Sequence, residues 1–376
     1  MEFGWSEDQR HRYEQTLAAT LDAFPGGNSP AFDRENWCTA GKLGLLGASL
    51  PVEYGGQDLG ALDTALVFEA FGRGCLDTGL VFAAAAHLFA CAMPIAEFGS
   101  ATLRDRVLRA LACGDLVAGN AMTEADAGSD VAAMSTSAER VDGGYLLSGT
   151  KTFVSNGPVA DVFVTYAVTD PAAGPFATTA FVVDATVPGV EIGTPLDKLG
   201  MDGCAASAVT FDRAPVPDDA VLGAPGQGAM VFQHSMSWER ACLFALYLGV
   251  QDRLIEQSVR HVRARKQFGK RLAEFQSVSN RIVDMKLRVE SARLLLYRTC
   301  WAHDAGEPTV LFAALSKLAT SEAALAGATD AIQLFGYRGY LRDQGIEAAL
   351  RDAVGGTIFS GTSDIQRQLI AIEMGL

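Results

Sequence analysis

A glycine-rich polar segment, MTEADAGSD (122–130), has the residue types that bind phosphate groups. Gly128 and Ser129 allow the backbone to approach a ligand closely, and exposed amides beside hydroxyls form a cradle for a pyrophosphate. A short glycine-rich motif is a weak signal, because a polar turn with a helix cap has the same composition. Taken alone, the segment fits either a phosphate cradle or such a turn.

A second segment, KTFVSNG (151–157), combines an aromatic residue with a small hydroxyl residue. The ring of Phe153 offers a flat surface for stacking, and Ser155 offers a hydrogen-bond donor for the edge of a flavin. An ordinary half-buried strand would have the same residues, so the segment by itself leaves both interpretations open.

Two further segments follow toward the C-terminus. RARKQFGKRLAEFQ (263–276) mixes five basic residues with two phenylalanines. Arg265 and Gln267 are suited to a dinucleotide phosphate, with Phe268 packing beside it, although a solvated helix end and turn is the simpler account. QLFGYRGY (333–340) reads by default as a helix that ends at glycines.

The elements that must position these segments change along the chain. From residue 1 to 117, apolar residues recur at three- and four-residue spacing, which predicts helices at 7–21 and 61–71. From 118 to 225, β-branched and aromatic runs alternate with Gly and Pro. These runs predict strands at 159–168, 178–185 and 206–212.

Long helices are expected again from 226 to 376. One apolar stripe within 279–305 steps by three and four residues and suits a helix bundle; its members are Ile282, Met285, Val289, Ala292 and Leu296. The sequence therefore predicts an α+β multidomain fold. Its expected domains are an N-terminal helical domain (1–117), a middle β-barrel or sandwich domain (118–225) and a C-terminal four-helix bundle (226–376).

Bulk composition narrows the class of protein. The 376 residues are 49% apolar, enough for a large core. The most apolar run, 80–95, is short for a membrane span and contains a histidine, so we expect a buried core helix. A net charge of −14 disfavours nucleic acid or an anionic membrane as partner. Seven scattered cysteines and a polar N-terminus indicate a reducing cytoplasm, with no disulfide framework, metal site or secretory signal.

A fifth segment, IFSGTSDIQR (358–367), gives the other four a common interpretation. All five match the acyl-CoA dehydrogenase family in order and spacing, and the resemblance spans nearly the whole chain. It implies non-covalent FAD and a homotetramer, built as a dimer of dimers, whose FAD sites are shared between subunits.

The resemblance also implies which residues contact FAD. They are Met122, Thr123, Gly128, Ser129, Phe153, Val154, Ser155, Arg265, Gln267, Phe268, Gln276, Gln333, Gly336, Tyr337, Thr362 and Asp364. The set 265–276 resembles residues that reach the FAD of a neighbouring subunit. The chain departs from the family at Phe153 and Ser155, where tryptophan and threonine are more usual, and at Tyr337, where a second glycine is more usual.

The largest departure concerns the catalytic base. Before Gly-Thr-Ser most of the family has a glutamate, and this chain has Ser360. The resemblance implies that Glu239, on the adjacent helix, takes its place, while Ser360 still supplies a backbone N–H to the thioester oxygen. Nearby apolar residues should raise the pKa of a Glu239 carboxyl toward neutral. Without the family context, Glu239 would read as a surface residue paired with Arg240.

Longer stretches, including 237–249 and 339–366, resemble a branch of the family that acts on L-proline held on a carrier protein. This branch makes the pyrrole-2-carboxyl unit of antibiotics. The resemblance implies a peptidyl carrier protein with phosphopantetheine-linked L-proline as partner, and Ser129, Arg240 and Gly361 as substrate-binding residues. We expect Arg240 to belong to a basic patch that docks the acidic carrier protein.

Two alternatives stay open at this level. A short branched-chain acyl-CoA dehydrogenase would share the FAD site and Glu239 but would accept free CoA thioesters. A degenerate, non-catalytic subunit with a flavin fold would bind flavin weakly and react with no thioester.

Overall fold

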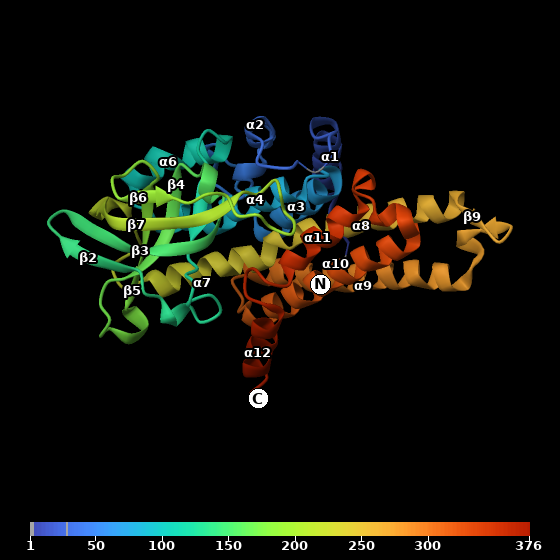
Figure 1. The fold of residues 1–376 in the computed structure, drawn as a ribbon. Helices are drawn as coiled ribbons and strands as arrows, with labels where there is room; N and C mark the ends of the chain where they lie inside the picture. Colours follow the sequence, from blue (N-terminus) through green and yellow to red (C-terminus); the bar gives the residue numbers. More distant parts are fainter. Residues whose placement is uncertain (1–3, 28) are drawn as a thin grey trace.

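Helices open the chain in the computed structural model, which describes residues 4–27 and 29–376 (Figure 1). Residues 1–3 lie outside the described residues. They belong to the polar N-terminal segment from which the absence of a secretory signal was predicted. The first helix begins at a capping box, because the Ser6 hydroxyl accepts from the Gln9 N–H and the Gln9 side chain accepts from the Ser6 N–H. The α-helices of this part are α1 (Glu7–Ala23), α2 (Arg34–Lys42), α3 (Ala61–Gly74), α4 (Thr78–His87), α5 (Met93–Phe98) and α6 (Ala101–Cys113).

The apolar run 80–95 is buried throughout, which confirms the expected core helix. It is not a regular α-helix, because a π-helical turn, Leu88–Ala92, separates α4 from α5. Two helical stretches, Thr78–Phe98 and Val310–Tyr340, are long and apolar enough to cross a membrane. The most apolar window of Thr78–Phe98 is 94% buried inside the protein, and that of Val310–Tyr340 is 50% buried. The two stretches are therefore only weak evidence for a membrane span.

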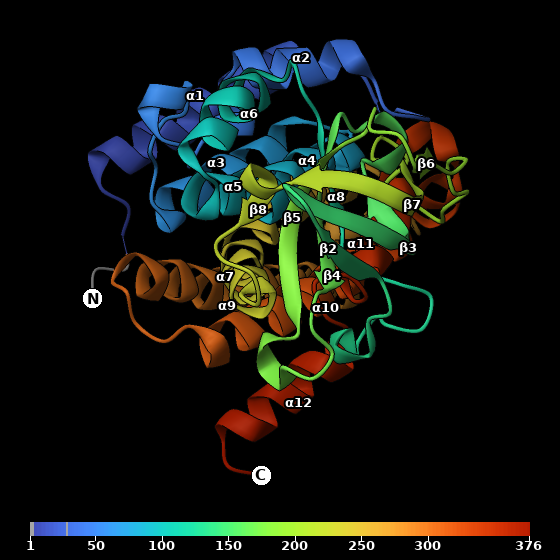
Figure 2. The ribbon, with the colours of Figure 1, turned by 90° about the vertical axis from the view of Figure 1, so that its left-hand side faces the viewer.

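The middle part is one eight-stranded sheet in the order β6-β7-β3-β1-β4-β5-β8, with β2 pairing both β3 and β4 (Figure 2). Its central strand, β1, runs antiparallel to β3 and parallel to β4. The strands are β1 (Ala118–Ala121), β2 (Ser137–Val141), β3 (Gly144–Ser155), β4 (Val162–Val168), β5 (Thr178–Asp184), β6 (Val190–Ile192), β7 (Ala206–Pro217) and β8 (Val221–Leu222).

The last part of the chain returns to helices, as expected. In α9 the predicted stripe faces inward: Met285, Val289, Ala292 and Leu296 are buried, and Ile282 is half-buried. The elements are α7 (Gly228–Trp238), a π-helical turn (Glu239–Leu243), α8 (Ala245–Ala264), a hairpin of β9 (Lys266–Gln267) and β10 (Lys270–Arg271), α9 (Gln276–Asp304), α10 (Val310–Phe335), α11 (Ile346–Gly356) and α12 (Ser363–Glu373).

The two ends of the molecule differ in what surrounds them. The sheet lies at one end of the view and the β9–β10 hairpin at the other, with the bundle helices between them (Figure 1). The segment after β1 and the end of β3 therefore face α4, α7 and the 358–362 segment, whereas 265–276 is far from the sheet.

Candidate active site

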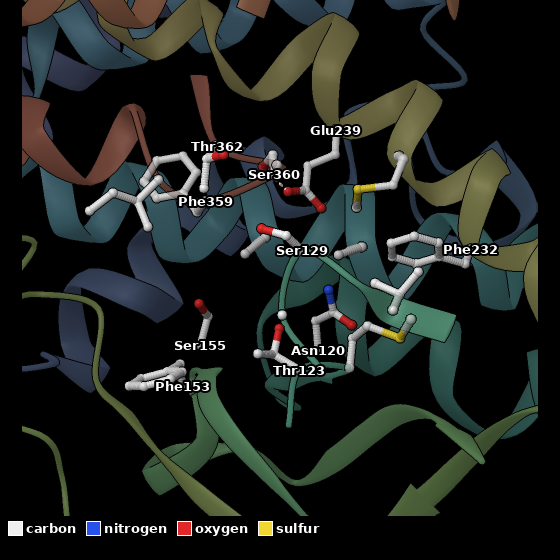
Figure 3. Close-up of a pocket in the computed structure, with 18 of the residues that line it drawn as sticks. Asn120, Thr123, Ser129, Phe153, Ser155, Phe232, Glu239, Phe359, Ser360 and Thr362 are labelled. Carbon is white, nitrogen blue, oxygen red and sulfur yellow. Dashed lines mark hydrogen bonds between the residues drawn. The ribbon is translucent and has the colours of Figure 1, made fainter. Parts of the chain in front are cut away.

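A cavity of about 390 Å³ opens where the three parts of the chain meet (Figure 3). Its polar lining residues come from four separate segments, and all of them except Asn120 were predicted from the sequence. They are Asn120, Thr123, Ser129, Ser155, Glu239, Ser360 and Thr362. Most of the remaining lining residues are apolar, namely Phe82, Ala86, Ala90, Met122, Val131, Phe153, Phe232, Met236, Ile358 and Phe359.

Glu239 enters this cavity from the start of the π-helical turn 239–243. A π-helical turn holds one more residue than an α-turn, which changes the direction of the side chains that follow, and such turns occur frequently at functional sites. The second π-helical turn of the chain, 88–92, packs against the first one, and its Ala90 lines the same cavity. The two irregular turns therefore shape the space around the Glu239 carboxylate.

The Glu239 carboxyl is 7% exposed, and the Ser360 hydroxyl donates a hydrogen bond to it. Burial raises its pKa above the usual range for a glutamate, while the Ser360 hydrogen bond and the positive charges of Arg240 and Lys317 oppose that shift. A carboxyl held this way is ionised near neutral pH less readily than in water and is a stronger base once ionised.

The backbone at Ser360 and Gly361 is left-handed, with φ of 56° and 89°. A serine in this conformation is strained, and the surrounding structure must hold it. The Ser360 carbonyl accepts from Arg240 Nε at 3.3 Å and from Gln366 Nε2 at 3.2 Å. Since Thr362 caps α12 by accepting from the Ile365 N–H, the whole turn is fixed beside the cavity.

Two expectations for this turn need correction. Arg240 is not an exposed docking residue: it is half-buried and binds the Ser360 carbonyl, so its guanidinium positions the turn from inside the protein. Ser360 does not contribute through its backbone alone, because its hydroxyl also holds the Glu239 carboxylate.

A buried ion pair anchors the 122–130 segment. Lys151 Nζ lies 2.9 Å from Glu124 Oε1, with the two side chains 0% and 6% exposed. Burial alone would raise the pKa of Glu124, but hydrogen bonds from Ser135, Thr136 and Lys151 hold it at about 2. The Thr152 N–H also donates to the Thr123 carbonyl at 2.7 Å. The two predicted cofactor segments are thus tied to each other.

Phe153 stands with its ring 68% exposed at the cavity and its backbone at φ 55°. It also borders an adjoining cavity of about 470 Å³ between Ser155, Phe359 and the loop around Leu199. Val154 points the other way, into the core of the sheet, and is 0% exposed. The predicted contact of Val154 with the cofactor would therefore have to be made by its backbone.

The residues around the cavity fit a flavin. Phe153 and Ser155 form one wall, and Phe359 and Thr362 lie on the opposite wall (Figure 3). An exposed ring facing open space, with hydroxyl groups on both sides, suits a flat heteroaromatic group with a polar rim. Gly128 and Ser129, the residues predicted to bind phosphate, line the same cavity.

The other predicted cofactor residues lie outside the cavity. Phe268 and Tyr337 are 92% and 77% exposed, at the β9–β10 end of the bundle. Their segments are neighbours, because the rings of His261 and Phe335 stack at a centroid distance of 4.2 Å. The further members of this set are Arg265, Gln267, Gln276, Gln333 and Gly336. Asp364, at the start of α12, also has an exposed side chain.

The sequence interpretation missed several lining residues. Phe232 and Met236 precede Glu239 by seven and three residues on one helical face, a spacing that was visible in the sequence. Asn120 is a polar residue inside a short strand, which is a weaker signal. Phe82, Ala86 and Ala90 had been assigned only to a buried helix.

The site thus consists of a buried carboxylate, a strained turn beside it and a wall suited to a flavin. The chain belongs to the acyl-CoA dehydrogenase family of FAD-dependent oxidoreductases. The models of the N-terminal, middle and C-terminal domains of acyl-CoA dehydrogenase match residues 7–115, 119–214 and 226–375.

Individual relatives indicate which members of the family the chain resembles. The chain is 50% identical, over 100% of both chains, to an L-prolyl-peptidyl-carrier-protein dehydrogenase of Pseudomonas fluorescens. It is 41% identical to a protein of the same name from a Serratia species, over 100% of this chain and 99% of that one. A solved structure described as PigA with FAD and proline superposes with a TM-score of 0.97, at 41% identity and full coverage of both chains.

Proposed function

We propose that the protein uses FAD to oxidise L-proline bound as a thioester to a peptidyl carrier protein, as a step of antibiotic biosynthesis. The observation that carries the proposal is the buried Glu239 carboxylate, which lies beside the Ser360 turn in a cavity whose wall suits a flavin. The 50% identity to a prolyl-carrier-protein dehydrogenase over the full chain supports the choice of substrate.

Each residue has one task in this proposal. Glu239 removes the α-proton of the prolyl thioester, and FAD held beside Phe153 and Ser155 would supply the acceptor for the β-hydrogen and its electron pair. Negative charge grows on the thioester oxygen as the α-proton leaves, and the Ser360 N–H stabilises it. The hydrogen bonds of the described residues use the Ser360 carbonyl and hydroxyl rather than this N–H, so it is available to a substrate. Ser129 and Gly361 line the space that the pantetheine arm would occupy.

One such oxidation gives a pyrroline, and the aromatic pyrrole-2-carboxyl thioester requires the removal of two more electrons. Aromatic stabilisation makes the second step favourable. The second step requires reoxidised FAD and an ionised Glu239, and its proton leaves a ring carbon other than the α-carbon, which lost its hydrogen in the first step.

We further propose a homotetramer with shared FAD sites. Phe268, Tyr337 and Arg265 are exposed and do not line the cavity. The β9–β10 hairpin beside them lies at the end of the chain opposite the sheet (Figure 1). The side chains of Val283, Leu287 and Leu294 on α9 are 62%, 64% and 51% exposed, and apolar groups in such number on one helix suit a subunit interface.

The carrier protein is expected to dock through a small, salt-sensitive surface. Since Arg240 lies inside, the docking cations must be other side chains near the cavity mouth. The proposed location is the cytoplasm, and the division of the chain at residues 118 and 226 stays a prediction.

The test is flavin reduction without oxygen. Purified protein with FAD is mixed with prolyl-loaded carrier protein, prolyl-CoA or a branched short-chain acyl-CoA, and the flavin absorbance is followed. We expect rapid bleaching with the loaded carrier protein and little with either CoA thioester. Equal bleaching by the CoA thioesters would favour a short branched-chain acyl-CoA dehydrogenase. Bleaching by none of them would favour a non-catalytic flavin-fold subunit.

A further inference from the structure

One polar side chain of the cavity has no task in the mechanism above. Asn120 lies on β1, the central strand of the sheet, where its backbone faces Ser155 of β3 on one side and Val164 of β4 on the other. A residue held between two strands has a fixed position. Figure 3 shows its amide nitrogen pointing toward the Glu239 carboxylate on the opposite side of the cavity, with its amide oxygen turned to the side.

The amide oxygen of Asn120 is buried, and it has no hydrogen-bond partner among the residues that the structure describes. Buried polar atoms are nearly always paired, because an unpaired one loses its contacts with water without replacement. The neighbouring lining residues Met122, Phe232 and Met236 offer no donor. The oxygen is closed off from the cavity, whereas the amide nitrogen faces it. The amide nitrogen is therefore the group that a bound molecule can contact.

The end of the cavity next to Asn120 is rigid and apolar. The ring of Phe232 is held edge-on by the ring of Tyr166, with the centroids 5.7 Å apart. Ala86 and Ala90 also line the cavity, and their small side chains leave room for a small ring. A bound ring that carries one nitrogen would find a single kind of partner here, the amide of Asn120.

We infer that Asn120 binds the ring nitrogen of the prolyl group and so selects an amine-bearing ring over a carbocyclic one. This inference rests on the proposed function. The ring nitrogen is bonded directly to the α-carbon, so a substrate whose α-hydrogen faces Glu239 places that nitrogen in the space between Glu239 and Asn120. The Asn120 amide N–H donates to the lone pair of a neutral ring nitrogen, and the amide adds no second negative charge beside the Glu239 carboxylate.

The ligand chemistry explains why an asparagine is useful in this position. Acyl groups made only of carbon and hydrogen would leave the Asn120 amide N–H unpaired, which disfavours their binding. A site built to hydrogen-bond a substrate nitrogen therefore rejects the analogue that lacks it far more strongly than an apolar pocket could.

The experiment compares two rings of nearly equal size on the same carrier protein, prolyl and cyclopentanecarbonyl. The rate of flavin reduction is measured for both with the FAD-loaded wild type and with Asn120→Leu, which keeps the shape of the side chain and removes its polar atoms. We expect the prolyl-to-cyclopentanecarbonyl rate ratio to fall roughly 10- to 100-fold in Asn120→Leu. An unchanged ratio would overturn the inference, whether or not both rates fall together.

A control and a second variant keep the test decisive. Phe232→Leu changes the same cavity without touching a polar group, so it should alter both rates in the same direction and preserve the ratio. If Asn120→Leu does not fold with FAD, Asn120→Ala replaces it and must show the same fall in the ratio. A wild type that reacts with neither substrate would overturn the proposed function and this inference together. A wild type that reacts with the prolyl group, with an unchanged ratio in the variants, would overturn the inference alone.

Discussion

The cavity and the β9–β10 end of the bundle both carry residues expected to bind one cofactor, but only the cavity is complete within a single chain. Around the cavity, the buried Lys151–Glu124 pair and the Arg240–Ser360 hydrogen bond fix the backbone. At the other end the rings of Phe268 and Tyr337 extend into solvent. Folding of a single chain therefore forms the cavity, whereas the proposed cofactor contacts at the far end would need a second subunit.

The largest effect is expected at the base itself. Glu239→Gln keeps the size of the side chain and removes its basicity, so flavin reduction by prolyl-loaded carrier protein should slow about 10²- to 10⁴-fold. FAD should remain bound, because the proposed flavin wall is made of other residues. Stopped-flow absorbance gives the rate and the visible spectrum gives the FAD content. A variant that reduces its flavin at the wild-type rate would remove Glu239 from the mechanism.

The buried Lys151–Glu124 ion pair should contribute more to stability than an exposed ion pair does. Lys151→Met leaves the Glu124 carboxylate buried without its cation, so the free energy of unfolding should fall by about 3–5 kcal/mol. The matched control is Arg213→Met, which breaks a pair with Glu139 whose two side chains are 62% exposed; its loss should be about 0–1 kcal/mol. Urea unfolding measures both.

The pH dependence of that stability has a definite sign. The pKa of Glu124 is lower in the folded protein, at about 2, than in the unfolded chain. Its contribution is therefore present at neutral pH and lost as the pH falls from the ordinary glutamate range toward 2. Similar losses for Lys151→Met and Arg213→Met would show that this pair does not anchor the cavity.

At the far end, a charge reversal tests the need for a second surface. Arg265→Glu should weaken FAD binding roughly 10- to 100-fold, because a charged hydrogen bond to phosphate becomes a repulsion. The control is Arg263→Glu, two residues earlier and also exposed. FAD content is measured by absorbance and molar mass by light scattering. Equal retention of FAD by both variants would contradict the proposed contact across subunits.

The smallest effect is expected at Ser360. The Ser360 hydrogen bond lowers the pKa of Glu239, which burial raises above its ordinary value. The base acts when ionised, so the reduction rate should rise with pH through an inflection above the ordinary glutamate range. Ser360→Ala removes the hydrogen bond and should move the inflection to higher pH, with a modest loss of rate once Glu239 is ionised. An inflection that moves down, or does not move, would show that the hydroxyl does not hold the carboxylate.

The sequence was sufficient to predict the order of the three parts and about half of the residues that line the cavity. These residues belong to short motifs that can be recognised without knowing the fold. The stacking surface of Phe153 and the assignment of Glu239 as the base were expected from those segments once the resemblance to the family was known. Asn120 was missed because a polar residue in a four-residue strand has no periodic pattern.

Contacts between distant segments were the other limit. Glu239 and Ser360 lie 121 positions apart, and their hydrogen bond depends on how α7 packs against the 358–362 turn. The inward direction of Arg240 has the same cause. From the sequence, a charged residue such as Arg240 is expected to be exposed. Its hydrogen bond to the Ser360 carbonyl shows that the guanidinium points inward.

The central claim is that the base has moved from position 360 to Glu239, and a double variant tests it most directly. Glu239→Gln with Ser360→Glu restores a carboxylate beside the same cavity, at the position more usual in the family. In single-turnover flavin reduction with prolyl-loaded carrier protein, we predict recovery of about tenfold or more over Glu239→Gln alone. Wild-type rates in the Glu239→Gln single variant, leaving nothing to recover, would contradict the claim.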